Sequence, residues 1–161
     1  MELPPEILRL VLILSCLGSG MMAGLFVAFS TFMMKALGSL EPAEGLKAMQ
    51  AINRFIIRPS FLIPFFGTGL LLVLACFMSS TSSSAFWLLC AGTVSYVVAC
   101  LASTMAFNVP LNSKLDSFAP NSPEGSEFWG RYLIVWTKWN HVRSIACVVS
   151  TLVAGFCLTI L

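Results

Sequence analysis

Four long apolar stretches alternate with more polar segments along the chain. They cover approximately residues 7–34, 59–78, 85–107 and 133–160. Each stretch has about the 20 residues, or more, that an α-helix needs to cross the hydrocarbon core of a bilayer. The pattern therefore predicts an all-α fold, a transmembrane four-helix bundle that forms a single domain over residues 1–161.

The two longest polar connections, residues 35–58 and 108–132, join the first span to the second and the third span to the fourth. With four spans, both connections lie on the same side of the membrane. That side carries eight cations, which are Lys35, Lys47, Arg54, Arg58, Lys114, Arg131, Lys138 and Arg143, and the other side carries Arg9. The positive-inside rule predicts cytosolic connections, with both termini across the membrane.

An amphipathic segment occupies most of the first connection. Glu41-Pro42 is typical of a helix start, and apolar residues then recur on one face at Leu46, Met49, Ile52 and Ile56. We expect an interfacial helix that lies on the membrane surface between the first two spans. Asn53 and Arg54 form its most polar point. They would either face lipid headgroups, which is the commoner arrangement, or cap a binding site.

The second connection opens with the segment Asn108-Val-Pro110-Leu-Asn112. Because a proline disfavours helical backbone at the preceding residue, we expect the chain to leave the third helix near residue 107. The two asparagines would either bind the freed backbone groups or offer amides to a ligand.

The last helix is predicted to start near Pro123, because Ser122-Pro123-Glu124 is typical of a helix N-terminus. An unbroken helix from there to Ile160 would be about 57 Å long. The hydrocarbon core is only about 30 Å thick. The first half of this helix therefore projects from the membrane, or the helix breaks near Gly130.

One face of this helix combines rings with polar groups. Trp129, Tyr132, Trp136, Asn140 and Arg143 follow one another at spacings of three and four, which places them in one stripe. Aromatic rings and cations at the end of a membrane helix commonly form an interfacial belt. The same residue types also suit a flat organic molecule with polar edges. The sequence leaves both interpretations open.

Candidate chemistry centres on His141, the only histidine, which could act as a general base near neutral pH. Asn140 and Arg143 could stabilise an oxyanion, and Trp136 and Trp139 could stack on a ring system. Further substrate-binding candidates at the same end of the bundle are Asn53, Asn108, Asn112 and Tyr132. This set suits the removal of a proton from an aromatic molecule that is already a carbon acid.

Composition narrows the alternatives. The chain is 58% hydrophobic and 10% charged, against about 25% charged residues in soluble proteins, which indicates an integral membrane protein. The scattered cations do not favour nucleic-acid binding. A single histidine argues against a metal site, which usually needs several such ligands, and it excludes a haem bound by two histidines. The six cysteines form no CxxC pair, which disfavours a thiol–quinone oxidoreductase with paired reactive thiols.

Four motifs give the chain a resemblance to a known family. They are Gly24-Leu-Phe-Val-Ala-Phe-Ser30, Met49-Gln-Ala-Ile-Asn53, Asn108-Val-Pro110-Leu-Asn112 and Trp136-Thr-Lys-Trp139-Asn140-His141-Val-Arg143. With these motifs the chain resembles, over nearly its whole length, the anthrone oxygenase family of small four-helix membrane proteins, a family largely of unknown function.

The resemblance implies an activity known from fungal pathway members, in which O2 oxidises an anthrone to an anthraquinone without a metal or a flavin. By this analogy, His141 would deprotonate the ring methylene. Asn140, Asn112 and Arg143 would hold the resulting phenolate-like oxyanion, and the anion would react directly with O2.

Two non-enzymatic interpretations stay open beside this one. The same cleft could hold a quinone, a haem or a lipid without turnover, or the protein could be a membrane scaffold. A channel is disfavoured because the spans carry only scattered Ser, Thr and Tyr. Stripes of small residues in the spans could serve packing within the bundle or a homo-oligomer.

Overall fold

The computed structural model describes residues 5–79 and 84–160. Within these ranges the chain is helical apart from short turns, and no strand occurs. The α-helices, and the π-helical segments η1 to η3, are α1 (Pro5–Ala28), η1 (Phe29–Met33), α2 (Met34–Gly38), α3 (Pro42–Ile56), α4 (Pro59–Met78), α5 (Ser84–Val94), η2 (Ser95–Ala102), η3 (Thr104–Asn108), α6 (Val109–Asp116) and α7 (Pro123–Thr159).

Four continuous helices are long and apolar enough to cross a membrane. They cover Pro5–Gly38, Pro59–Met78, Ala85–Asp116 and Pro123–Thr159. The all-α four-helix fold predicted from the sequence is thereby confirmed. Three of the four contain 32 to 37 residues. At 1.5 Å per residue these three are about 50 Å long, so they extend well beyond a hydrocarbon core of about 30 Å.

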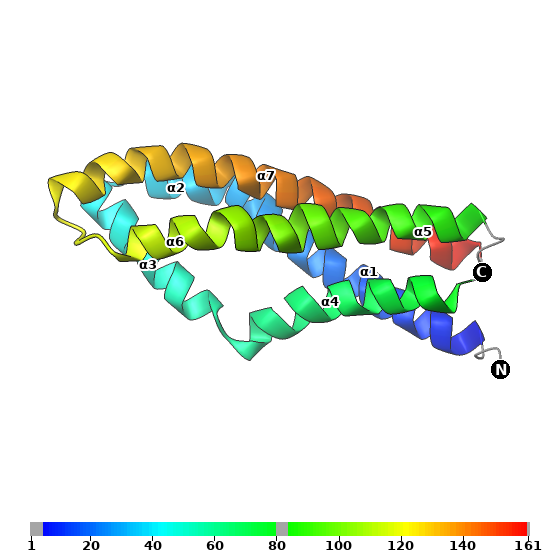
Figure 1. Ribbon diagram of the computed structural model, residues 1–161. Helices are drawn as coiled ribbons and strands as arrows, with labels where there is room; N and C mark the ends of the chain where they lie inside the picture. The colour runs from blue at the N-terminus through cyan, green and yellow to red at the C-terminus, as the bar shows by residue number, and fades with distance from the viewer. Residues whose placement is uncertain (1–4, 80–83, 161) are drawn as a thin grey trace.

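The helices form an elongated bundle (Figure 1). The start of α1, the end of α7, the end of α4 and the start of α5 lie at one end. The opposite end holds α2, α3, α6 and the start of α7. The shorter α4 lies along only part of the length, and α3 leads to it obliquely from the far end. Both polar connections therefore belong to the same end of the molecule, while their cytosolic location stays a prediction.

The last helix begins as predicted and does not break. Ser122 is its N-cap, and its hydroxyl accepts a hydrogen bond of 3.0 Å from the backbone N–H of Gly125. Helix α7 then runs through Gly130 without interruption to Thr159. Its first half extends toward the end that holds α2 and α3. Because the helix does not break, we expect this half to project from the membrane.

The third membrane helix does not end near residue 107, so that prediction is wrong. The helix continues to Asp116, and Pro110 lies in the first turn of α6. Directly before it, η3 has π-helical hydrogen bonding, in which the backbone N–H of Val109 bonds to the carbonyl of Thr104, five residues back. This wider turn allows the helix to accommodate a ring that lacks an N–H. Residues 109–116 are thus helix, and the second connection shortens to 117–122.

The amphipathic helix predicted in the first connection is α3, and its buried face includes Leu46 and Met49, as expected. That face packs against α6 and α7 within an apolar cluster that also contains Leu115 and Trp129. Gln50 adds two hydrogen bonds, of 2.9 and 3.0 Å, from its side-chain amide to backbone carbonyls at the end of α6 and just after it. Protein contacts therefore hold α3 in place, and its position on the membrane surface stays a prediction.

Gly45 of α3 packs closely against both α2 and α7. A Cβ atom there would lie 2.6 Å from the carbonyl oxygen of Leu37 and 2.9 Å from the Trp129 ring. We expect Gly45→Ala to lower the free energy of unfolding by about 1–3 kcal/mol, because a backbone carbonyl and a buried ring cannot both move away. Denaturant unfolding in detergent micelles would measure the loss.

Gly130→Ala is the matched control, because no atom lies within 4 Å of a Cβ built at this exposed position. It should leave stability unchanged or raise it by up to about 1 kcal/mol, from the higher helix propensity of alanine. Equal effects of the two substitutions would contradict the tight contact at Gly45.

Candidate functional site

A cavity of about 270 Å³ lies between α1, α3, α4, the third membrane helix and α7. Its lining residues are Leu25, Phe26, Phe29, Met49, Ile52, Asn53, Arg54, Ile56, Ile57, Phe61, Leu62, Phe65, Phe66, Thr104, Met105, Val109, Asn112, Ser113, Asp116, Trp136 and Arg143. Most of the wall is apolar, and five of its members are phenylalanines. Four residues predicted for the site, Asn53, Asn112, Trp136 and Arg143, line this one cavity although they come from three helices.

The aromatic and polar stripe of α7 faces the protein interior. Trp129, Tyr132, Trp136, Asn140 and Arg143 are each at most 4% exposed. An interfacial belt would present these side chains to lipid headgroups. Their burial excludes a belt that faces headgroups and places the stripe in the protein interior.

Arg143 brings a positive charge into this apolar interior. Its guanidinium lies over the rings of Phe26 and Trp136, at 4.5 and 4.9 Å from the ring centroids. Among the described residues the one ion pair joins Arg54 to Asp116, so no carboxylate balances Arg143. An unbalanced buried charge is costly in free energy, and a buried cation inside a membrane bundle indicates a binding function.

Asn140 positions this guanidinium. Its side-chain oxygen accepts a hydrogen bond of 2.8 Å from Nη2 of Arg143. Its amide nitrogen donates two bonds of 2.7 Å to the first membrane helix, one to the carbonyl of Phe26 in α1 and one to the hydroxyl of Ser30 in η1. Ser30 is in turn 2.9 Å from the hydroxyl of Ser144. The network fixes α1 against α7 beside the cavity, which makes Asn140 a positioning residue.

A second polar group surrounds the side chain of Asn112. Its oxygen accepts hydrogen bonds from the hydroxyl of Tyr132, at 2.7 Å, and from the indole N–H of Trp136, at 2.9 Å. Because the oxygen already has two donors, Asn112 fixes the orientation of both rings. Its own amide hydrogens stay available to the cavity that it lines.

Three buried polar atoms in the described part of the chain have no hydrogen-bond partner: Nδ2 of Asn53, Oδ1 of Asn108 and Nε of Arg143. Asn53 and Arg143 line the cavity, whereas Asn108 does not and donates its amide to the carbonyl of Trp136 at 3.3 Å. Buried donors are normally satisfied. Two donors without a partner within hydrogen-bond distance therefore belong to residues that line this one cavity.

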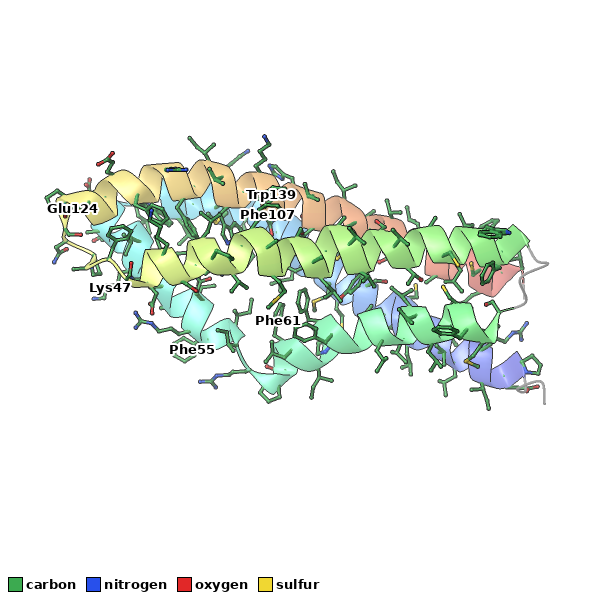
Figure 2. All side chains as sticks on the ribbon, in the orientation of Figure 1. Lys47, Phe55, Phe61, Phe107, Glu124 and Trp139 are labelled. Atoms are coloured by element: carbon green, nitrogen blue, oxygen red, sulfur yellow. The ribbon has the colours of Figure 1, made fainter. Side chains whose placement is uncertain are left out.

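Five of the nine predicted residues do not line the cavity. Tyr132, Asn108 and Asn140 are buried and bond to residues that do line it, whereas Trp139 and His141 lie away from it. Trp139 stacks on Phe107 with ring centroids 3.6 Å apart and planes at 4° (Figure 2), and neither ring lines the cavity. His141 is exposed and is likewise absent from the lining. Its position on α7 is roughly 140–160° around the helix from Trp136 and Arg143, at about 100° per residue. The geometry therefore does not support His141 as a base for a molecule in this cavity.

The sequence did not reveal which residues form the rest of the cavity wall. Phe26, Phe61 and Phe65 come from spans with no polar periodicity, and only helix packing brings them to the cavity that Arg143 also lines. Thr104, from the third membrane helix, is a further wall residue. Its hydroxyl lies 3.5 Å from Nη1 of Arg143.

The thiols pair in space although they do not pair in sequence. The Cys100 and Cys147 sulfurs are 3.5 Å apart, and those of Cys76 and Cys90 are 3.8 Å apart. The absence of CxxC motifs was thus a poor argument against paired thiols, because different helices supply the partners. These cysteines sit among apolar side chains, which disfavours the thiolate, and none lines the cavity. No three His, Cys, Asp or Glu side chains gather as metal ligands in the described ranges.

The fold and the site define a multi-pass membrane protein with a deep apolar cavity and an unbalanced cation in its wall. Residues 54–153, more than half of the chain, match the sequence model of a family described as anthrone oxygenase. The chain belongs to this family, and the matched residues contain two of the four motifs, Asn108–Asn112 and Trp136–Arg143. No curated protein and no solved structure matches it.

Asn140 and its neighbour His141 should differ sharply in their effect on stability. Asn140→Leu removes two bonds to the first membrane helix and leaves Nη2 of Arg143 without its acceptor, so we expect a loss of about 1–3 kcal/mol in unfolding free energy. His141→Leu, at an exposed position, should change it by about 0.5 kcal/mol or less. Denaturant unfolding of the two variants in micelles makes the comparison. Equal losses would show that the Asn140 network does not join α1 to α7.

Proposed function

We propose that this protein is a membrane-embedded oxygenase that binds an anthrone-like polycyclic phenol as its anion and allows it to react with O2 without a cofactor. The observation that carries the proposal is the buried guanidinium of Arg143 in the wall of an apolar cavity, with no carboxylate of the described residues paired to it. Membership of the anthrone oxygenase family supports an oxygenase-like role.

The charge of Arg143 explains how a weakly acidic carbon could lose its proton in this site. A ligand anion next to Arg143 would balance a charge that is otherwise uncompensated in a low-dielectric interior. Deprotonation of an anthrone delocalises negative charge onto its carbonyl oxygen, where the guanidinium can stabilise it. Oriented donors of this kind act on the charge as it develops in the transition state.

The shape of the cavity suits a compact, flat aromatic body. Its volume of about 270 Å³ is near the lower end of small-molecule sites, which span about 300–1,000 Å³. Phe61 and Phe65 stack at 5.1 Å and provide a ring surface. At the polar edge, the free amide hydrogens of Asn53 and Asn112 can bind a second oxygen of the ligand.

The reaction balances without a further reagent. The ring methylene gives its first proton to water at the polar end of the cavity, and the anion transfers one electron to O2. The two radicals combine at the same carbon, and protonation gives a hydroperoxide, which eliminates water to form a carbonyl. In the net change the methylene loses both hydrogens, one oxygen atom of O2 becomes the carbonyl oxygen, and the other leaves as water. In this scheme Arg143 stabilises the anion, Asn140 holds Arg143 in place, and His141 has no role in the cavity.

O2 uptake in nanodiscs, with a panel of anthrones as substrates, tests the proposal. We expect Arg143→Met to lower the enzymatic rate by about a hundred- to a thousandfold, as loss of an oxyanion donor does. The variant should remain folded, because an apolar side chain replaces an unbalanced buried charge. Arg131→Met is the matched control, since Arg131 lies on the same helix and is exposed. It should retain the wild-type rate.

Anthrones also oxidise spontaneously, so only the excess over protein-free nanodiscs counts. Wild-type protein without such an excess would refute the oxygenase proposal. His141→Ala distinguishes the two assignments of chemistry. Because this side chain is exposed, we expect His141→Ala to retain the wild-type rate. If His141→Ala is inactive and Arg143→Met is active, His141 is the general base.

A further inference from the structure

We propose that the cavity opens sideways into the bilayer, through a slit between α4 and the η3–α6 part of the third membrane helix, and that the ligand enters from the lipid phase. This inference rests on the proposed function for the chemical class of the ligand. It adds the source of that ligand and the residues that control its passage.

The exposed members of the cavity lining define the edges of the slit. On the third membrane helix they are Met105, Val109, Ser113 and Asp116, at spacings of four, four and three, so they occupy one helical face. Opposite them stand the exposed lining residues of α3, α4 and the turn between them, which are Arg54, Ile57 and Phe66.

Hydrogen bonds join the two sides of the slit at its ends. At one end the hydroxyl of Tyr96 donates to the carbonyl of Phe65, at 3.0 Å. At the other, Arg54 binds one carboxylate oxygen of Asp116 through Nε, at 3.1 Å, and Nη2, at 2.8 Å. Figure 2 shows the Phe61 side chain extending from α4 into the region between these helices.

The slit changes in polarity along its length. Met105 and Val109 provide its apolar part and Ser113 and Asp116 its polar part, over about 17 Å of helix. Met105 is 55% exposed and Phe66 is 48% exposed. The Arg54–Asp116 pair bridges the polar part. The apolar edges would face lipid in a membrane. The unbridged route into the cavity is therefore the apolar one.

This route fits one kind of occupant, a flat aromatic molecule dissolved in the bilayer that carries a single ionisable hydroxyl. Such a molecule can pass the apolar edges in its neutral form. It can ionise once it lies beside Arg143, which is 4% exposed. A phospholipid would instead have to bring its permanently charged headgroup through the apolar edges to reach the same cation, at a high desolvation cost.

The test measures how fast a hydroxylated anthraquinone leaves the protein in nanodiscs after excess colourless anthraquinone is added. The visible absorbance of the dye reports its ionisation in the cavity. Met105→Trp narrows the slit, and we expect it to slow dissociation and association alike by about tenfold, with the dissociation constant unchanged. Val98→Trp is the control, because Val98 lies seven residues earlier on the same face, is 58% exposed and does not line the cavity.

Asp116→Asn weakens the ion pair at the polar end and should slow neither rate as Met105→Trp does, since the pair does not lie on the lipid route. Unchanged rates in Met105→Trp, or faster rates in Asp116→Asn, would contradict entry from the bilayer. Neither result would contradict the binding site itself. Wild-type protein that binds no dye would overturn the ligand class and the slit together. A phospholipid that co-purifies, resists displacement by the dye and is lost in Arg143→Met would replace the aromatic occupant by a lipid.

Discussion

The positive charge of Arg143 in an apolar interior is the constraint on which the arrangement of the site depends. A guanidinium at this depth needs acceptors and polarisable surfaces, and the structure supplies one amide oxygen, one hydroxyl and two aromatic faces. These groups come from three different helices. The charge therefore links α1, the third membrane helix and α7, while it still lacks a counter-charge and so favours an anionic ligand.

The π-helical segments lie next to these polar contacts. η1 begins three residues after Phe26 and includes Ser30, and the carbonyl of Phe26 and the hydroxyl of Ser30 both accept bonds from Asn140. η3 begins at Thr104 and ends at Asn108, the two residues through which it contacts Arg143 and the backbone of Trp136. Such wide turns are frequent at functional sites, because they redirect side chains and loosen the regular hydrogen-bond ladder. Here they also allow Pro110 to remain within a continuous helix.

Length divides the molecule into two functional parts. Three helices exceed the hydrocarbon thickness, so their extensions, together with α3, form a region beyond the span in which tryptophan, tyrosine and asparagine can be buried by protein. The cavity lies where the two apolar clusters of the structure meet, since its wall takes Phe26 and Phe65 from one and Met49 and Trp136 from the other. A ligand there has apolar surroundings on the bilayer side and hydrogen-bond donors on the other.

The sequence by itself determined the class of fold, the start of the last helix at Pro123 and the stripe on α7, because hydropathy, helix caps and the helical period act locally. It also gave Arg143, Asn112 and Asn53 as candidates. The helix end at residue 107 followed from local reasoning that did not hold, since a π-helical turn accommodates the proline. The role assigned to His141 stays a prediction that the geometry does not support, since a residue one position along a helix faces another direction. Only the tertiary structure decided which side chains share a cavity, because the phenylalanine wall, the Arg54–Asp116 pair and the thiol pairs join segments that no local pattern relates.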